Sequence, residues 1–187
     1  MNTCVIASYR YGHLAAQAIE SVLNQTLPFD RVLLVDDGVG DCAHLPAIYP
    51  EVEYVLRDKN MGVVPNFNDM LARVTTERVM YLGADNWLDH RALEITSAVD
   101  ADIVSYAAWL IQRGVPQRWH VDVPHGSSLY RVAKAREVGG YERGGHPRYA
   151  EEDSVMFARM RTAGATFVNL QDTLLMYRWR HRRNFNQ

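Results

Sequence analysis

The sequence predicts an α/β protein built on a mixed, mostly parallel central sheet with crossover helices. Short apolar strands alternate with amphipathic helices through the first hundred residues, which is typical of this class. Hydrophobic residues make up 48% of the 187-residue chain, enough for a buried core. The apolar runs stop far short of the roughly 20 residues that a membrane-spanning helix needs. We therefore expect one domain over residues 1–187.

The first half of the chain supplies the more regular elements. Thr3–Ser8 is a short apolar run that ends in small and polar residues, as a buried strand does. Apolar residues recur at helical spacing from His13 to Asn24, and Pro28 disfavours helix at the residue before it. Further strands are predicted at 31–35, 52–56, 78–82 and 103–107, with helices at 63–74 and 89–99.

The second half is less regular. A hairpin is predicted over 109–123, then a strand at 127–131 and a helix at 132–138 that Gly139 and Gly140 end. Residues 143–149 have the composition of a loop. The helix predicted over 151–163 begins with three carboxylates, which suit the positive end of a helix dipole. Two final strands are expected at 166–170 and 174–179.

Polar residues follow three of the predicted strands at the point where each strand ends. They are Ser8-Tyr9, Asp36-Asp37 and Gly83-Ala84-Asp85. Ligands of open α/β sheets bind at the carboxyl ends of the strands. The sequence therefore predicts a binding site at this edge of the sheet.

Each carboxylate group has a chemical and a structural interpretation. Asp36 and Asp37 suit a ribose, a base edge or a metal, but Asp-Gly is also common turn chemistry. Asp85 is suited to hold a divalent cation beside a diphosphate, or to cap a helix. Glu151-Glu152-Asp153 contains candidates for a general base, or charges matched to a helix N-terminus. Taken singly, these patterns do not decide between the two interpretations.

Charge is divided unevenly along the chain. Residues 1–100 carry 7 Lys/Arg and 14 Asp/Glu, whereas residues 101–187 carry 13 and 8. An anionic substrate at the seam is one explanation, and uneven surface charge is the other. The two cysteines, Cys4 and Cys42, fit reduced thiols, and the N-terminus lacks a signal-peptide pattern, so we expect a cytoplasmic protein.

Several motifs occur together in a specific order. Val5-Ile-Ala-Ser-Tyr-Arg is followed by Val32-Leu-Leu-Val-Asp-Asp-Gly, Asn60-Met-Gly and Tyr81-Leu-Gly-Ala-Asp-Asn. Ser127-Ser-Leu-Tyr-Arg, Val138-Gly-Gly-Tyr-Glu, Glu152-Asp153 and Tyr177-Arg178 complete the series. In this order and spacing the chain resembles the family 2 glycosyltransferases, which have a GT-A fold.

The resemblance implies a role for each motif. Residues 1–108 correspond to the nucleotide-sugar-binding half, and residues 109–187 to the half that binds the acceptor and holds the catalytic base. The base falls on Asp153, with Glu152 beside it. Mn²⁺ or Mg²⁺ would be bound by Asp85 and His181. The residues expected to bind the nucleotide and donor are Ala7, Ser8, Tyr9, Asp36, Asp37, Arg57, Asn60, Gly62, Asn68, Gly83, Ala84, Asp85 and Arg178.

The implied reaction is an inverting transfer from a nucleotide diphosphate sugar to an acceptor hydroxyl. UDP is the expected carrier, with GDP and dTDP left open, and the acceptor is a saccharide or a lipid-linked molecule. One departure from the family pattern matters, because Gly83 replaces the first acidic residue of the Asp-x-Asp element. An inactive nucleotide-sugar-binding module therefore stays open as an alternative. A nucleotidyltransferase ranks below it, because the loop after the first strand, Ser8-Tyr-Arg-Tyr-Gly-His, lacks the glycine density of a triphosphate-binding loop.

The C-terminal tail is basic, with four arginines within residues 178–183. Arginine suits phosphate because its guanidinium donates two parallel hydrogen bonds. The donor diphosphate, a lipid phosphate at a membrane surface and nucleic acid are the competing partners. We expect Arg178 and His181 to serve the diphosphate. Peripheral membrane contact stays open, and no nucleic-acid partner is expected.

Overall fold

The computed structural model describes residues 1–112, 114–119, 123–145 and 151–178, and its centre is a nine-stranded sheet. The strand order is β3-β2-β1-β4-β8-β6-β9-β5, and β7 pairs with β6 off this path. The strands are β1 (Asn2–Ser8), β2 (Arg31–Asp36), β3 (Glu53–Leu56), β4 (Arg78–Gly83), β5 (Trp87–Leu88), β6 (Ile103–Gln112), β7 (Val115–Trp119), β8 (Leu129–Arg131) and β9 (Phe167–Arg178).

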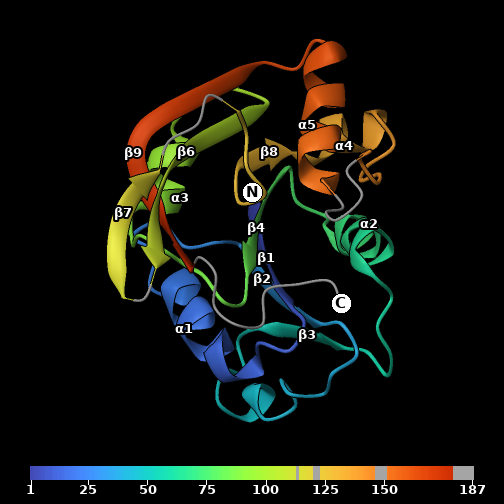
Figure 1. Ribbon diagram of the computed structural model, residues 1–187, viewed down its shortest axis with the longest axis vertical. Helices are drawn as coiled ribbons and strands as arrows, with labels where there is room; N and C mark the ends of the chain where they lie inside the picture. The colour runs from blue at the N-terminus through green and yellow to red at the C-terminus, as the bar shows by residue number, and fades with distance from the viewer. Residues whose placement is uncertain (113, 120–122, 146–150, 179–187) are drawn as a thin grey trace.

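Helices cover both faces of this sheet (Figure 1). They are α1 (Gly12–Leu23), α2 (Val63–Arg73), α3 (Ala92–Ser97), α4 (Val132–Glu137) and α5 (Glu152–Thr162), with a short 3-10 turn η1 (Leu45–Ala47). One apolar core joins the sheet to α1, η1 and α3, and a second joins it to α2, α4 and α5. Three layers result, as predicted for an α/β protein.

Side-chain alternation along the strands explains why both faces are apolar. In β1, Cys4 and Ile6 enter the first core while Val5 enters the second. In β4, Met80 and Tyr81 point to opposite cores in the same way. Successive side chains of a strand point to opposite faces, so a strand covered on both sides is apolar throughout. The continuous apolar runs of the sequence reflect this double burial.

The two halves of the sheet differ in strand direction. In the first half β1 pairs in parallel with β2 and β4, and β2 pairs in parallel with β3. In the second half β8 is antiparallel to β4 and β6, and β7 is antiparallel to β6. β6 also pairs in parallel with β9, and β5 pairs antiparallel with β9. The mixed sheet is confirmed: the first half is all parallel, and the second half combines one parallel pair with several antiparallel pairs.

Three predicted elements differ from the structure. The final strands expected at 166–170 and 174–179 are one strand, β9, whose register against β6 shifts twice. The polar pair Gln171-Asp172 lies in this irregular part, and it interrupts the apolar pattern without ending the strand. Likewise, the strand at 103–107 and the first arm of the hairpin form one strand, β6, and the helix at 89–99 is reduced to Ala92–Ser97.

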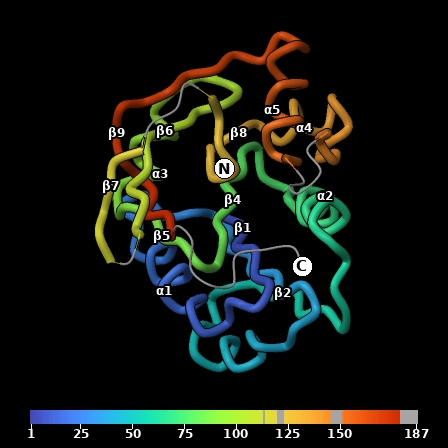
Figure 2. The backbone as a smooth tube through the Cα atoms, viewed as in Figure 1, coloured from blue at the N-terminus to red at the C-terminus, as the bar shows by residue number. Residues whose placement is uncertain are grey.

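The end of strand β9 lies beside α1, an element from the start of the chain. Figure 2 shows it running from α5 along β6 and ending beside β5 and α1. Among the described residues, the helices are too short or too polar to cross a bilayer.

Candidate nucleotide-sugar site

The ends of β1, β2 and β4 meet at one edge of the sheet, as the sequence predicts. Ser8 lies in register with Asp36, and Ala7 with Gly83. The pairing continues past the strands, because Asp37 N donates to Ser8 O at 2.9 Å and Ala84 N to Ala7 O at 2.9 Å. Tyr9, which follows directly, is 38% exposed. A buried polar edge with an exposed aromatic ring beside it suits a nucleoside.

Asp37 joins the β2 tip to the loop that precedes α2. Its carboxylate accepts hydrogen bonds from Asn60 Nδ2 at 2.9 Å and from Met61 N at 3.0 Å. Arg57 Nε lies 3.5 Å from the same carboxylate. Gly38 allows this close approach, because at its φ of +80° an added Cβ would lie 2.1 Å from the Lys59 carbonyl carbon. The Asp-Asp-Gly turn is therefore tied to the Asn60-Met61 loop.

Like Asp37, the predicted donor-binding residues Arg57 and Asn68 are engaged in contacts within the protein. Arg57 also bonds Asn66 and Asp69, with Nη2 2.5 Å from Asp69 Oδ2. The Asn68 amide bonds both backbone groups of Tyr141, at 2.8 Å and 2.9 Å. These contacts attach α2 to β3 and to the segment after α4. Both residues thus have a structural use in addition to the predicted one. Gly62, with a φ of +83°, begins α2.

A separate cluster of possible metal ligands lies at the end of β2 and in the loop that follows it. One ligand atom from each of Asp36, Asp41 and Cys42 falls within 4.8 Å of the others. The Asp36 oxygens already accept backbone hydrogen bonds from Val39 and Cys42, and Asp41 accepts one from Gly12. Burial raises the pKa of the Cys42 thiol to about 12, which keeps it protonated. These contacts hold the loop after β2 in place.

Asp85 lies at the β4 tip and is 6% exposed. A Cβ added to Gly83 would lie 2.7 Å from Asp85 Oδ1 and 2.9 Å from Asn86 Nδ2. The space that a first acidic side chain would need is therefore taken by the side chains of its own neighbours. In this arrangement Asp85 is the carboxylate that the turn offers to a cation.

Arg178, at the end of β9, lies beside Asp85. Its guanidinium donates to the Asp85 carbonyl oxygen and to Gln17, and its backbone N donates to Asn86 Oδ1 at 2.9 Å. Its Cζ lies 4.5 Å from the centre of the Trp87 ring. Arg178 therefore fastens the Asp85 turn to α1 and β9. His181 lies outside the described residues.

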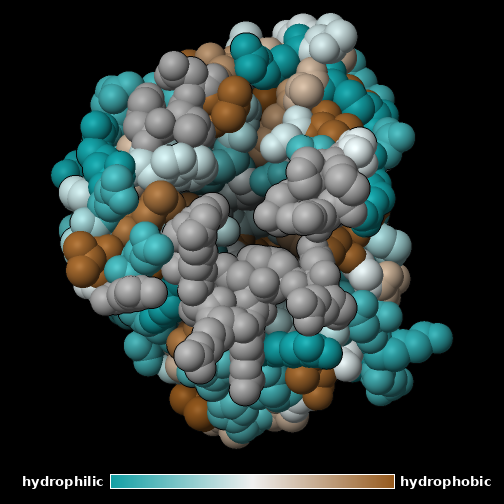
Figure 3. Space-filling model, viewed as in Figure 1, coloured by the Kyte–Doolittle hydropathy of each residue, from teal (hydrophilic) through white to brown (hydrophobic). Residues whose placement is uncertain are grey.

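The predicted base is at the first turn of α5. Asp153 Oδ1 accepts a hydrogen bond from Ser154 N at 2.7 Å, and an added Cβ on Gly126 would lie 3.0 Å from Oδ2. Burial raises the pKa of Asp153 above its usual range, and it also raises that of Glu152. Figure 3 shows that the face toward the viewer is hollowed near its centre, beside the start of α5 as drawn in Figure 1.

Tyr177 connects the two carboxylate regions. Burial, with smaller contributions from the charges of Asp85 and Asp153, raises its pKa to about 12. Both carboxylates therefore lie near one β9 side chain. Tyr11, which begins α1, also responds to Asp85 and to Tyr177, and its pKa is raised mainly by burial. Sequence reasoning missed Tyr11, although it follows the β1 tip by only three positions.

The family profile described as "Glycosyl transferase family 2" matches residues 3–150. The chain belongs to glycosyl transferase family 2. A relative from Nostoc sp., described as an uncharacterized glycosyltransferase, is 31% identical over 107 residues, which are 54% of this chain and 33% of the relative. The family match covers most of β1 and all of β2 and β4, and therefore the edge described above.

Solved structures of glycosyltransferases share the fold of this family 2 chain. S. aureus TarS in complex with UDP-GlcNAc aligns with a TM-score of 0.77 at 16% identity, over 96% of this chain and 59% of that one. The Pyrobaculum calidifontis mannosyltransferase PcManGT, in complex with GDP-Man and Mn²⁺, aligns with a TM-score of 0.74 at 16% identity, over 97% and 58%. The GT-A fold is confirmed, and this chain spans about three fifths of each structure.

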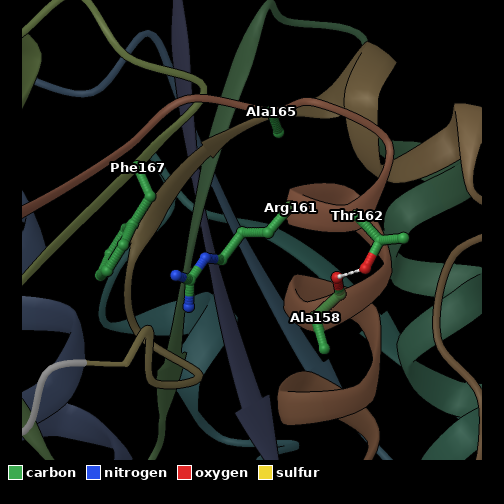
Figure 4. Close-up of a pocket in the computed structure, with 5 residues that line it drawn as sticks. All are labelled: Ala158, Arg161, Thr162, Ala165 and Phe167. Carbon is green, nitrogen blue, oxygen red and sulfur yellow. Dashed lines mark hydrogen bonds between the residues drawn. The ribbon is translucent and has the colours of Figure 1, made fainter.

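A shallow hollow of about 610 Å³ lies apart from the predicted site residues of this family 2 chain. It is lined by Ala158, Arg161, Thr162, Ala165 and Phe167, where α5 ends and β9 begins. In Figure 4 the Arg161 side chain extends toward Phe167, and its Cζ lies 5.1 Å from the ring centre. Its lining includes none of the residues predicted to bind the donor or to act as the base.

Proposed function

We propose that this chain is the nucleotide-sugar-binding and catalytic domain of an inverting glycosyltransferase. It transfers a sugar from a nucleotide diphosphate, most simply UDP, to a hydroxyl of a saccharide or lipid-linked acceptor in the cytoplasm. Family membership supports the reaction class. The complexes of TarS with UDP-GlcNAc and of PcManGT with GDP-Man support the donor class.

The observation that carries the proposal is the position of Tyr177 near both Asp85 and Asp153. A transferase of this type needs a site for the leaving diphosphate on one side of the reacting carbon and a base on the other. Asp85 is at the β4 tip and Asp153 at the start of α5, so the two carboxylates come from different layers of the fold. The charge of each raises the pKa of Tyr177, which supports placing both carboxylates near the same β9 side chain.

The residues present fit a divalent cation at one position. Mn²⁺ and Mg²⁺ prefer oxygen ligands, and the buried Asp85 carboxylate at the diphosphate edge is such a ligand. When bound there, the ion would neutralise charge on the leaving diphosphate. Asp36 and Asp41 fit less well, because backbone N–H groups already occupy their oxygens.

Asp153 then acts on the acceptor. The acceptor oxygen forms a bond to the anomeric carbon, the bond from that carbon to the phosphate oxygen breaks, and the acceptor proton passes to Asp153. Attack opposite the leaving group inverts the anomeric configuration. Burial raises the pKa of Asp153, which makes its carboxylate a stronger base than an exposed one. Ser8, Asp37 and Tyr9 would hold the nucleoside.

The test begins with a thermal-shift screen of nucleotide sugars with and without Mn²⁺, because a ligand that binds only the folded state raises its stability. With the donor found, the transfer rate of Asp153→Asn is compared with that of Asp172→Asn, an exposed carboxylate of β9. We expect Asp153→Asn to lose roughly 10²- to 10⁴-fold in rate and Asp172→Asn to keep its activity. Near-normal transfer by folded Asp153→Asn would refute the assignment of the base.

Gly83 favours one second candidate, a nucleotide-sugar-binding module without turnover. The absence of a first acidic side chain leaves the turn with fewer oxygen ligands for a cation. Such a module would show a donor-dependent rise in melting temperature, but neither transfer nor hydrolysis of any donor that binds.

A further inference from the structure

The turn His125–Ser128, which leads into β8, is built around the His125 ring. Nδ1 accepts a hydrogen bond from Ser127 N at 3.2 Å, and Nε2 lies 3.0 Å from the Tyr106 carbonyl oxygen. An Nδ1 that accepts from a backbone N–H leaves the proton on Nε2, which then donates to the Tyr106 carbonyl. Both ring nitrogens are therefore used to fix backbone.

The rest of the turn is held as firmly. Ser128 N donates to His125 O at 2.8 Å, and His125 N donates to Ser128 Oγ at 3.1 Å. The Tyr106 hydroxyl of β6 donates to the Ser127 carbonyl, and the rings of Tyr106 and His125 pack edge to face with centres 4.8 Å apart. Burial lowers the pKa of His125 to about 4, so the ring is neutral near pH 7.

Gly126, inside this turn, faces the first turn of α5. An added Cβ would lie 3.0 Å from Asp153 Oδ2, and a backbone hydrogen bond from Gly126 lowers the pKa of Asp153. Other described residues near the carboxylate are Ser154 beside it, Glu152 on the same helix, and Tyr141 and Tyr177 from other segments. Gly126 differs from them because it comes from the connection between β7 and β8.

We propose that His125 is a positioning residue for this transferase: it fixes the turn whose Gly126 holds the Asp153 carboxylate in place. This inference rests on the proposed function, because it assumes that Asp153 is the base. A phenylalanine could fill the same space against Tyr106, but it could not bond Ser127 N or the Tyr106 carbonyl. Loss of those bonds would leave buried backbone groups unpaired and loosen the turn.

The experiment measures the pKa of Asp153 by carboxyl-carbon NMR, with the signal assigned from its absence in Asp153→Asn. In His125→Phe we expect this pKa to rise by about 1, because a hydrogen bond to the charged carboxylate is weakened. With the donor from the thermal-shift screen, we expect kcat to fall roughly 10- to 100-fold while KM for the donor is unchanged. The matched control is His90→Phe, because His90 is an exposed histidine distant from His125 in the sequence. Its Asp153 pKa and its kcat should match those of the wild type.

An unchanged pKa and an unchanged kcat in folded His125→Phe would overturn the inference. If His125→Phe does not fold, Ser128→Ala removes only the acceptor of His125 N, and it should move the pKa of Asp153 in the same direction by less. No movement there would also overturn the inference. The proposed function fails separately, through normal transfer by Asp153→Asn.

Discussion

Replacing Gly83 with aspartate would restore the two-carboxylate pattern of the family, yet we expect it to harm the protein. The added Cβ would lie 2.7 Å from Asp85 Oδ1 and 2.9 Å from Asn86 Nδ2. Optimal contacts between non-bonded heavy atoms are roughly 3.5–4.0 Å, so both side chains would have to move.

Neither neighbour is free to move without loss. Asp85 and Asn86 are each 6% exposed, and Asn86 Oδ1 accepts the backbone hydrogen bond of Arg178. Overpacking of this kind costs about 1–3 kcal/mol. For a protein of this length, each kcal/mol lowers the melting temperature by roughly 2–4 °C. The expected loss for Gly83→Asp is therefore roughly 2–12 °C, with a further cost from placing a second negative charge beside Asp85.

The assay is thermal unfolding followed by circular dichroism, with and without Mn²⁺. Gly83→Ala is the matched control, because it adds the same Cβ without the charge. Both variants should melt below the wild type, with Gly83→Asp lower, and Mn²⁺ should stabilise neither one more than the wild type. If Gly83→Asp melts at the wild-type temperature and gains more from Mn²⁺, then the turn has room for a second ligand and the steric reasoning is wrong.

Three further changes test other parts of the site. The free energy of unfolding measured in urea should fall by roughly 1–3 kcal/mol more for Gly38→Ala than for Gly40→Ala. Both glycines have a positive φ, but only Gly38 lies against the neighbouring loop. Equal losses in the two variants would contradict this reasoning. Arg178→Lys keeps the charge but loses the fork that holds the Asp85 turn, so donor affinity measured by calorimetry should fall about tenfold, whereas unchanged affinity would refute a role in the site. Asp153→Asn should raise the melting temperature near pH 8, because burial raises the pKa of Asp153 and the folded state carries the cost of the ionised form there. That gain should shrink as the pH falls through the raised pKa, and a gain that is constant with pH would show that charge is not its cause.

The polar edge of the sheet was predictable because its signals are local. β1 and β2 end at the polar residues Ser8 and Asp36, β4 ends at Gly83 just before Asp85, and parallel strands place their carboxyl ends together. Position along the chain was therefore enough to bring Ser8, Asp36 and Gly83 to one edge. The long strand β9 was predicted in two pieces, because the polar pair Gln171-Asp172 within it resembles a turn when the partner strand is unknown.

The contacts that join distant segments could not be derived in the same way. Nothing near Asn68 in the sequence indicates that its amide bonds Tyr141, and nothing near His125 indicates that its turn reaches Asp153. These contacts depend on how α2, α5 and the β7–β8 connection pack, which is a property of the whole sheet. Resemblance to the family supplied the position of Asp153, but not the residues that hold it.

Arg178 shows how such packing alters the interpretation of a motif. From the sequence, Arg178 was expected to serve the donor diphosphate, ahead of a lipid phosphate or nucleic acid. In the structure two of its donors bond Gln17 and the Asp85 carbonyl, and its guanidinium stacks on Trp87. The positive charge of Arg178 can still attract a phosphate. Its hydrogen-bond donors, however, are used within the protein, to hold the Asp85 turn against α1. Because Gly83 leaves Asp85 as the carboxylate that this turn offers, holding Asp85 in place matters more here than it would in a turn with two carboxylates.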